Sequence, residues 1–177
     1  MAVSFSTPNR PSIEILAAWP VYTASMKLAE ALIERADLQK RAAQLEERLV
    51  RNLQVQEGEL PSEDPLELLN ELLSVVTALE LLLPRIHRAN LEARLPGGLS
   101  LTEALTRRDL LDLRLKVLRR AAATASERQN RYSNSEVKIV AVIPARELQR
   151  LIDPLAKQRR ELEAEIQQTN WLTELPE

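Results

Sequence analysis

The chain has 177 residues, no cysteine and a formal net charge of −2. This length is sufficient for one domain with its own core, and the balanced charge gives no general attraction to nucleic acid or anionic lipid. Without cysteine the chain has no disulfide, thiol nucleophile or thiolate metal site, and it suits a reducing cytosol. The abundance of leucine and the presence of only 3 glycines are typical of a helix-dominated protein.

The first 25 residues differ from the rest, because they contain three prolines and no sustained helical period. Their apolar run at residues 13–19 is too short to cross a bilayer and contains Glu14. It is also a poor fit to a signal peptide. Because a helical pattern begins at Met26, we interpret residues 1–25 as an N-terminal extension, either a flexible arm or a misassigned upstream start.

Two long helices are predicted in the first half of the chain. Apolar residues recur every three or four positions over about residues 26–56, and Gly58 then ends this helix. Asp64 at an N-cap position, followed by Pro65, predicts the start of a second helix over about residues 64–95. The apolar face of this second helix is wider than a two-helix seam needs, which implies more than one neighbour.

A third helix is predicted over about residues 101–133, because Ser100 and Glu103 form a capping box after the turn at Pro96. At 100° per residue, this helix carries a second apolar stripe roughly 120° from its main seam, formed by Leu110, Leu113 and Val117. Proline inside the second helix, at Pro84, is expected to kink it.

A short strand is predicted at residues 137–143, because this run is rich in β-branched residues and is punctuated at both ends. A single strand needs a partner for its backbone groups. We therefore expect it to pair with its copy in another subunit, through Val137, Ile139, Ala141 and Ile143. A fourth helix follows over about residues 145–170, with Pro154 either kinking it or splitting off a short leading turn.

One pattern occurs twice in the chain: Ile86, Asn90 and Leu95 recur at the same offsets as Ile166, Asn170 and Leu175. The recurrence is loose, and in a leucine-rich chain coincidence is favoured over internal duplication. If it is real, the second and fourth helices end alike.

These elements predict a mainly α fold. Residues 26–177 are expected to form a single helical domain of long antiparallel helical hairpins, a coiled-coil-like bundle with one short strand at about residues 137–143. The extra apolar stripes and the unpaired strand predict that copies of the chain associate with one another.

Catalytic motifs are missing from the sequence, which has no glycine-rich phosphate loop, no GxSxG elbow and no paired histidines. His87 is the only histidine, and we interpret it as a half-exposed helix residue rather than a general base. Carboxylates interleave with Lys and Arg at helical spacing, which favours solvated ion-pair faces over a metal site. We therefore predict no enzyme activity, no catalytic residue, no cofactor and no metal.

Two segments contain candidate interaction residues. The predicted third helix is locally basic, but its cations are spread around the helix and base-stacking aromatic residues are nearly absent, so nucleic acid is not expected as a partner. Trp171 is more typical of a packing anchor than of a ligand contact. The candidates are Arg128, Arg131, Tyr132, Lys138, Asn170 and Trp171.

Short motifs along residues 26–177 resemble a family of small bacterial proteins known as septicolysin-like. The resemblance implies a mostly helical fold and self-association, and the family's name suggests a pore-forming toxin; it implies no binding or catalytic residue. The motifs that carry it are Met26-Lys27-Leu28-Ala29-Glu30-Ala31-Leu32, Arg51-Asn52, Val55-Gln56-Glu57-Gly58, Leu101-Thr102-Glu103-Ala104-Leu105, Arg108-Asp109, Ser126-Glu127-Arg128-Gln129, Arg131-Tyr132-Ser133 and Thr169-Asn170-Trp171.

Two functions follow from these observations. The first is a cytoplasmic, non-enzymatic, homo-oligomeric helical scaffold or binding module whose extra apolar stripes are subunit contacts. The second is a septicolysin-like membrane-active protein, and membrane contact is expected only in this alternative. Against it, the sequence has no long apolar hairpin and no Lys-rich amphipathic face with aromatic anchors.

Overall fold

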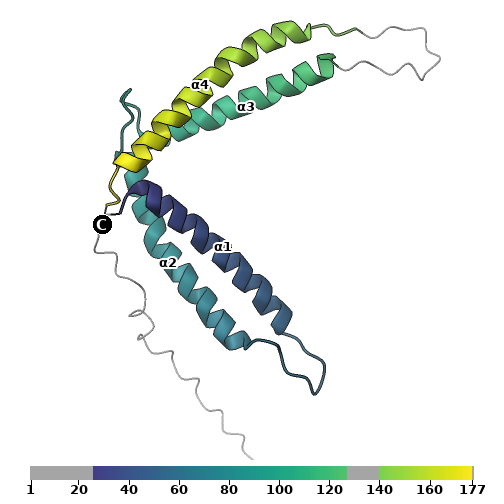
Figure 1. Ribbon diagram of the computed structural model, residues 1–177, viewed down its shortest axis with the longest axis vertical. Helices are drawn as coiled ribbons and strands as arrows, with labels where there is room; N and C mark the ends of the chain where they lie inside the picture. Colours follow the sequence, from purple (N-terminus) through teal and green to yellow (C-terminus); the bar gives the residue numbers. More distant parts are fainter. Residues whose placement is uncertain (1–25, 127–139, 177) are drawn as a thin grey trace, which may run out of the picture.

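In the part of the chain that the structure describes, four helices form two antiparallel hairpins that meet at one end. The computed structural model describes residues 26–126 and 140–176. Its helices are α1 (Leu28–Asn52), α2 (Pro65–Glu92), α3 (Leu101–Ser126) and α4 (Ala145–Leu172). In Figure 1, α1 packs along α2 and α3 along α4, and the two hairpins diverge like the arms of a V. We call the α1–α2 hairpin arm 1, the α3–α4 hairpin arm 2, and the end where they meet the apex.

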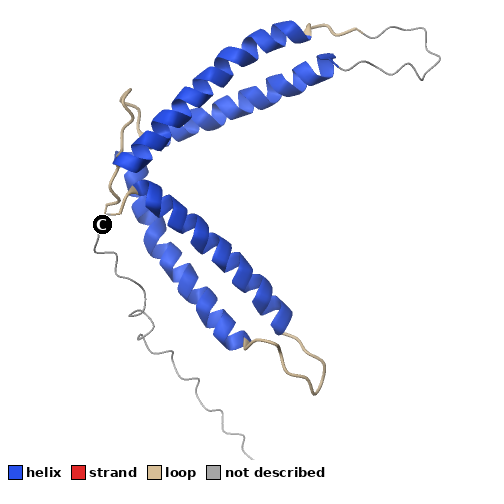
Figure 2. Cartoon of the chain, viewed as in Figure 1, coloured by secondary structure: helices blue, strands red, loops and turns tan. Residues whose placement is uncertain are grey.

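The core runs along the inside of arm 1, through the apex and into arm 2. Each helix contributes one seam of buried residues at threes and fours, which is the pattern that the sequence predicted. The mainly α fold of helical hairpins is therefore confirmed, and Figure 2 shows helices joined by loops. The core residues are Leu28, Ala31, Leu38, Leu45, Leu68, Val75, Leu82, Ile86, Ala89, Leu95, Leu101, Ala104, Leu111, Leu162, Ile166 and Leu175.

Backbone hydrogen bonds hold the apex together in two equivalent places. Between the end of α2 and the start of α3, the Leu101 N–H donates to the Ala93 carbonyl at 3.0 Å, and the Leu95 N–H donates to the Leu99 carbonyl at 2.8 Å. Between the end of α4 and the start of α1, the corresponding bonds are Leu28 N–H to Thr173 O at 2.9 Å and Leu175 N–H to Met26 O at 2.7 Å. The second junction joins chain segments far apart in sequence.

The two arms are structurally equivalent halves. A shift of 73 residues maps the start of α1 onto the start of α3, and a shift of 80 maps the end of α2 onto the end of α4. The recurrence of Ile86, Asn90 and Leu95 thus falls on equivalent positions, which favours internal duplication over coincidence. The first shift also pairs identical residues: Leu28 with Leu101, Glu30 with Glu103, Ala31 with Ala104, Leu32 with Leu105, Arg35 with Arg108 and Leu38 with Leu111.

The predicted capping box at the start of α3 is present. The Ser100 hydroxyl and backbone N–H both donate to Glu103 Oε2, at 2.7 and 2.8 Å, and the Glu103 N–H donates to Ser100 Oγ at 3.2 Å. These bonds stabilise the ionised carboxylate, so the hydrogen bond from the Ser100 side chain, followed by that from its backbone, lowers the pKa of Glu103. The start of α3 therefore depends on the charge of one carboxylate.

Replacing Ser100 with alanine is expected to lower the Tm by about 2–4 °C at neutral pH, because it removes the cap of α3. Since the folded-state pKa of Glu103 is depressed, its stabilisation is present above the usual carboxyl pKa and is lost as the pH falls through the folded value. The difference between wild type and Ser100→Ala should therefore shrink below about pH 4. Thermal unfolding followed by circular dichroism across pH 3–7 measures it, and a difference independent of pH would contradict it. Ser126→Ala, at an exposed site, is the control.

The predicted strand is not formed in the part of it that the structure describes. Residues 140–143 are loop and bend, with Ala141 exposed and Ile143 exposed by 53%. The physical reason is that no neighbouring segment supplies ladder partners there: within residues 26–126 and 140–176, β-type pairing is limited to isolated bridges at the apex. Val137 and Ile139 lie outside the described residues, so pairing between subunits through them stays a prediction.

The helix ends and prolines differ in detail from expectation. α1 ends at Asn52, where the sequence predicted about residue 56, and α4 extends to Leu172 rather than 170. Pro84 and Pro154 both lie inside continuous helices, so Pro154 does not split off a leading turn. Each helix has buried side chains on both sides of its proline, Leu82 and Ile86 around Pro84 and Ile152 and Leu162 around Pro154, and their packing supports the helix where the backbone donor is missing.

Candidate functional site

α2 carries a second apolar seam that the described part of the chain does not cover. Leu66, Leu69, Leu73 and Val76 follow one another at spacings of three and four, which is heptad spacing. At 100° per residue, this row lies about 130° around the helix from the buried seam that faces α1. Its leucines are exposed by 64%, 38% and 54%. A single hairpin buries only one side of each helix, so this row remains at the surface.

α3 carries a similar uncovered row. Leu110, Leu113 and Val117 have the same three-and-four spacing, and each is more than half exposed. This is the second stripe that the sequence predicted on the third helix. The main seam of α3, at Leu111 and Leu115, is buried within arm 2, where α3 packs on α4, so the stripe points elsewhere.

The two rows lead into one groove at the apex. His87 continues the heptad spacing of the α2 row, and Thr106 continues that of the α3 row one turn before Leu110. Both side chains line a groove of about 350 Å³ between the end of α2 and the start of α3. The full lining is His87, Asn90, Leu91, Thr102, Leu105, Thr106 and Asp109. The rows therefore lie on one side of the V, and together with this groove we call them the α2–α3 face.

The polar groups of the apex groove are partly engaged in structural contacts. Thr102 Oγ1 donates to the Asn90 carbonyl at 3.0 Å, which joins α3 to the end of α2. Asp109 accepts from Arg108 at 2.8 Å. His87 is exposed on α2 beside Leu91, which is itself exposed by 62%. The groove thus combines apolar surface with hydrogen-bonding groups, as the centre of a protein contact does.

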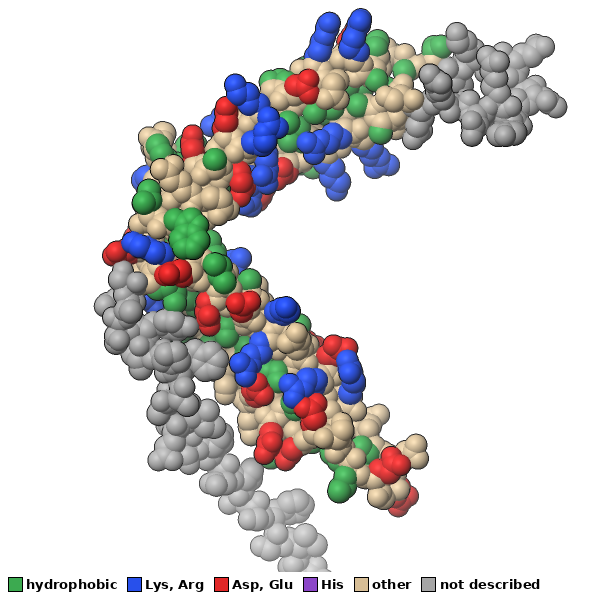
Figure 3. All heavy atoms as spheres, in the orientation of Figure 1, with side chains coloured by type: hydrophobic (Ala, Val, Ile, Leu, Met, Phe, Trp, Pro, Cys, Tyr) green, Lys and Arg blue, Asp and Glu red, His purple; other side chains and the backbone are tan. Residues whose placement is uncertain are grey.

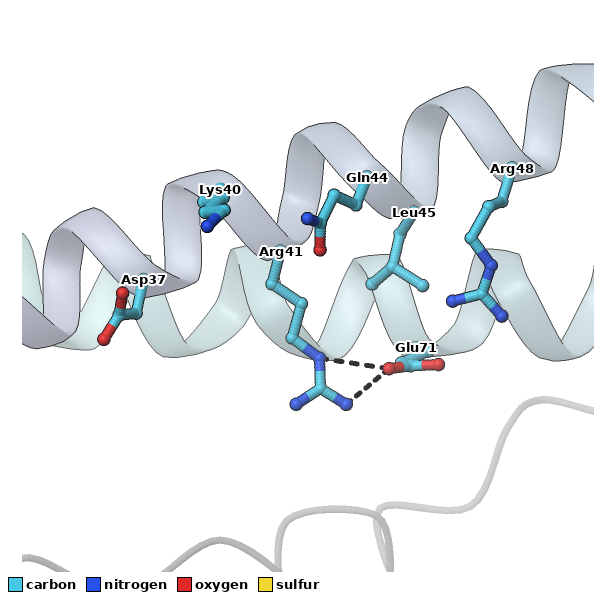
Figure 4. A pocket seen from close by; sticks show the side chains of 7 residues that line it. All are labelled: Asp37, Lys40, Arg41, Gln44, Leu45, Arg48 and Glu71. Carbon is cyan, nitrogen blue, oxygen red and sulfur yellow. Dashed lines mark hydrogen bonds and ion pairs between the residues drawn. The ribbon is translucent and has the colours of Figure 1, made fainter.

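A second groove, on arm 1, is charged. It has a volume of about 390 Å³, and Figure 4 shows its lining side chains along α1, with Arg41 reaching across to Glu71 on α2. The Arg41 guanidinium donates to Glu71 at 3.1 Å through Nε. Such exposed ion pairs contribute little stability, and they leave a shallow surface of neutralised charges. Its lining residues are Asp37, Lys40, Arg41, Gln44, Leu45, Arg48 and Glu71.

Arg48, next along α1, pairs with Glu63 in the loop before α2. The hydrogen bond from Arg48 lowers the pKa of Glu63, and the same bond raises the pKa of the Arg48 guanidinium. The pair fastens the tip of arm 1. It is an exposed structural contact rather than a site prepared for chemistry.

Asn170 and Trp171 are the only sequence-predicted interaction residues that the structure describes. Asn170 is buried at the end of α4, and its Oδ1 has no hydrogen-bond partner among the described atoms. Trp171, the next residue, is exposed by 54% and occupies the position equivalent to Leu91 of the apex groove. The remaining candidates, Arg128, Arg131, Tyr132 and Lys138, lie outside the described residues.

The sequence indicated the row on α3 and a wide apolar face on α2, but not which residues of α2 stay exposed, nor that the two rows meet. The wide face of the second helix and the second stripe of the third were visible as spacings. What the sequence could not indicate is that the two rows meet, because this depends on the angle at which α2 and α3 leave the turn at Pro96 and Gly97. Gly98 in this turn has a φ of +84°, a value that glycine adopts readily.

The described residues provide neither a metal-ligand cluster nor a membrane-spanning helix. No group of three or more His, Cys, Asp or Glu side chains is placed to hold a metal ion in residues 26–126 and 140–176. In those ranges no helix combines the length and apolarity that crossing a membrane requires.

Comparisons with known proteins give a family and a structural relative. The chain is similar to a functionally unknown conserved protein from Corynebacterium diphtheriae: the crystal structure of that protein matches with a TM-score of 0.81 and 40% sequence identity, over 86% of this chain and 100% of that one. None of the curated proteins matches. The sequence profile of a family of unknown function, DUF6847, matches residues 35–175.

These findings correct the resemblance drawn from the sequence. Neither comparison points to septicolysin-like proteins, so that assignment is wrong, and the pore-forming alternative that depended on it loses its basis. The motifs behind it are short: Leu101-Thr102-Glu103, for example, belongs to the helix-capping segment of α3, which many helical proteins share. Because the matching profile covers most of its length, the chain belongs to DUF6847, a family of unknown function.

Proposed function

We propose that this chain is a non-enzymatic helical scaffold that associates with copies of itself through the α2–α3 face. The observation that carries this proposal is the uncovered apolar row on each of the two helices. A soluble chain rarely keeps a long apolar stripe exposed unless a partner covers it. Self-association covers the stripes with the same chain and needs no further component.

The apolar area favours association on energetic grounds. Fully burying a leucine or valine side chain stabilises by about 1.5–3 kcal/mol, and the seven row residues are roughly half exposed already. Two copies that bury their rows together would gain roughly 10–20 kcal/mol. Association costs about 4–15 kcal/mol in lost freedom of motion. At the middle of these two ranges the gain exceeds the cost, which supports the proposed association.

A non-enzymatic role is supported by the state of the polar groups in the two grooves. In the apex groove Asp109 and Thr102 are engaged in contacts within the chain, and in the arm 1 groove Arg41 and Arg48 are paired with carboxylates. We retain the absence of cofactor and metal, the absence of a nucleic-acid partner and the cytoplasmic placement as predictions. An elemental analysis of purified protein tests the first of them.

Replacing Leu73 and Leu113 with glutamate is expected to convert the oligomer into a monomer, because each change puts a charge into a row that must be desolvated on contact. Sedimentation velocity at one fixed protein concentration measures the mass of wild type and variant. Val50→Glu is the matched control, since Val50 is equally exposed on arm 1 but lies on α1, outside the α2–α3 face. A wild-type protein that sediments as a monomer would contradict the proposed function.

A further inference from the structure

We propose that two copies stack with their α2–α3 faces together, so that α2 of each copy packs on α3 of the other around a two-fold axis. This inference rests on the proposed function and specifies its partner and geometry. The partner is a second copy of this chain, placed so that the two apex grooves meet. Arm 1 of one protomer then lies against arm 2 of its partner, which makes two four-helix bundles per dimer.

The shape of the molecule restricts how two such faces can meet. Both rows lead into the apex groove, and we place them on one side of the V that Figure 1 shows. A two-fold axis parallel to the line that bisects the V, and outside this side, turns the face over and exchanges the arms. Two copies related by this axis stack apex on apex, with α2 of one antiparallel to α3 of the other. The arrangement is closed, because each copy turns its α2–α3 face toward the other and no further copy can add.

Charge favours pairing of unlike arms. α2 has four carboxylates against two arginines, whereas α3 has six Arg and Lys against three carboxylates. The loop before α2 adds acidic side chains at the tip of arm 1, among them Glu57 and Glu59. Figure 3 shows the side of the V on which no histidine is visible, and on that side too acidic side chains lie at the tip of arm 1 and Lys and Arg side chains lie along arm 2. Stacking α2 on α3 brings opposite charges together, and stacking like arms would oppose like charges.

The register of α2 on the partner's α3 follows from the apex, because residues at equal distance from it face one another. Val76 lies 16 residues before the end of α2, and Val117 lies 16 residues after the start of α3. The same relation pairs the half-buried Leu83 with Leu110. The same relation places Glu80, which lies at the row's spacing between Val76 and His87, opposite Leu113 of the partner. Arg114 and Lys116 flank Leu113 on the two sides of the partner's helix. None of these three charged residues has an ion-pair partner among the described residues.

Cysteine cross-linking tests this arrangement directly, because the natural chain has no cysteine. Val76→Cys and Val117→Cys are prepared as separate proteins that differ in mass through a tag. Each is oxidised alone, and the two are oxidised together after mixing and exchange. Products are read by non-reducing electrophoresis and mass spectrometry. Arg119→Cys, on the opposite side of α3, replaces Val117→Cys as the control for chance collision.

The expected result is a disulfide-linked heterodimer from the mixture of Val76→Cys and Val117→Cys, at least tenfold above that from either protein alone or with the control. A high yield of disulfide-linked homodimer from Val76→Cys alone would show that arm 1 of one copy packs on arm 1 of the other. That result would overturn the arrangement. An oligomer of the right mass without any of these cross-links would overturn it too, while leaving the proposed self-association intact. A monomeric wild-type protein would overturn both, and sedimentation distinguishes that outcome from the others.

Discussion

Replacing Ile86 with alanine is expected to lower the free energy of unfolding by about 2–5 kcal/mol. Ile86 is fully buried near the end of α2, in the part of the core that joins the arms at the apex. The change removes three carbons and leaves a cavity that the helices cannot fill without breaking the paired backbone bonds of the apex. Urea unfolding followed by circular dichroism, at one fixed protein concentration, measures the loss.

Two comparisons make this result specific to the apex. Leu81→Ala, on the same helix at a site that is 66% exposed, should change the free energy of unfolding by less than about 0.5 kcal/mol. Ile166→Ala, at the equivalent position of α4, should cost as much as Ile86→Ala, because Ile166 is exposed by only 1%. A cost below about 1 kcal/mol for both isoleucine variants would contradict the placement of the core.

Replacing Ala104 with leucine is expected to destabilise the protein by about 1–3 kcal/mol and to widen the angle between the arms. Ala104 lies one turn into α3, is fully buried and corresponds to Ala31 of α1. Small side chains at these two positions let the helices approach closely where the arms meet. A leucine would need about three carbon atoms of space in a packed interior, so the helices must separate.

Chemical unfolding measures the stability change, and small-angle X-ray scattering measures the change of shape. Ala121→Leu is the matched control, because Ala121 is exposed nearer the end of α3 and a larger side chain there meets solvent. The control should leave both measurements unchanged. An Ala104→Leu variant with wild-type stability and an unaltered scattering profile would show that the apex is not closely packed at this residue.

Helix identity was readable from the sequence because it depends on local information. The three-and-four spacing of leucines, the N-cap at Asp64 and the capping box at Ser100 each act within a few residues of their own position. The strand was predicted from equally local signals, β-branched residues with punctuation at both ends, and its described half is a loop. Strand formation depends on a partner, which a local pattern does not supply.

In the candidate site, too, the local sequence pattern was informative and the tertiary contacts were not predictable. The row on α3 and the width of the apolar face on α2 could be read as spacings. The interaction residues predicted from the sequence were others: Trp171 on α4, and residues around Tyr132, which lie outside the described part of the chain. Exposure was the missing quantity, because an apolar row has the same sequence whether a neighbouring helix covers it or leaves it at the surface. The family resemblance failed for a related reason: short capping segments identify a helix start rather than a family.

The sequence by itself determined that the described part of this protein consists of long helices arranged as antiparallel hairpins, because each helix contains its own apolar seam. Only the tertiary structure decided that the two hairpins diverge as a V and that α2 and α4 end in equivalent ways. It alone also decided that the exposed apolar rows of α2 and α3 lie on the same side of the V. The physical reason is that these features depend on the packing at the apex. There Leu28, Ile86, Leu101 and Ile166, distant in sequence, are buried in one core.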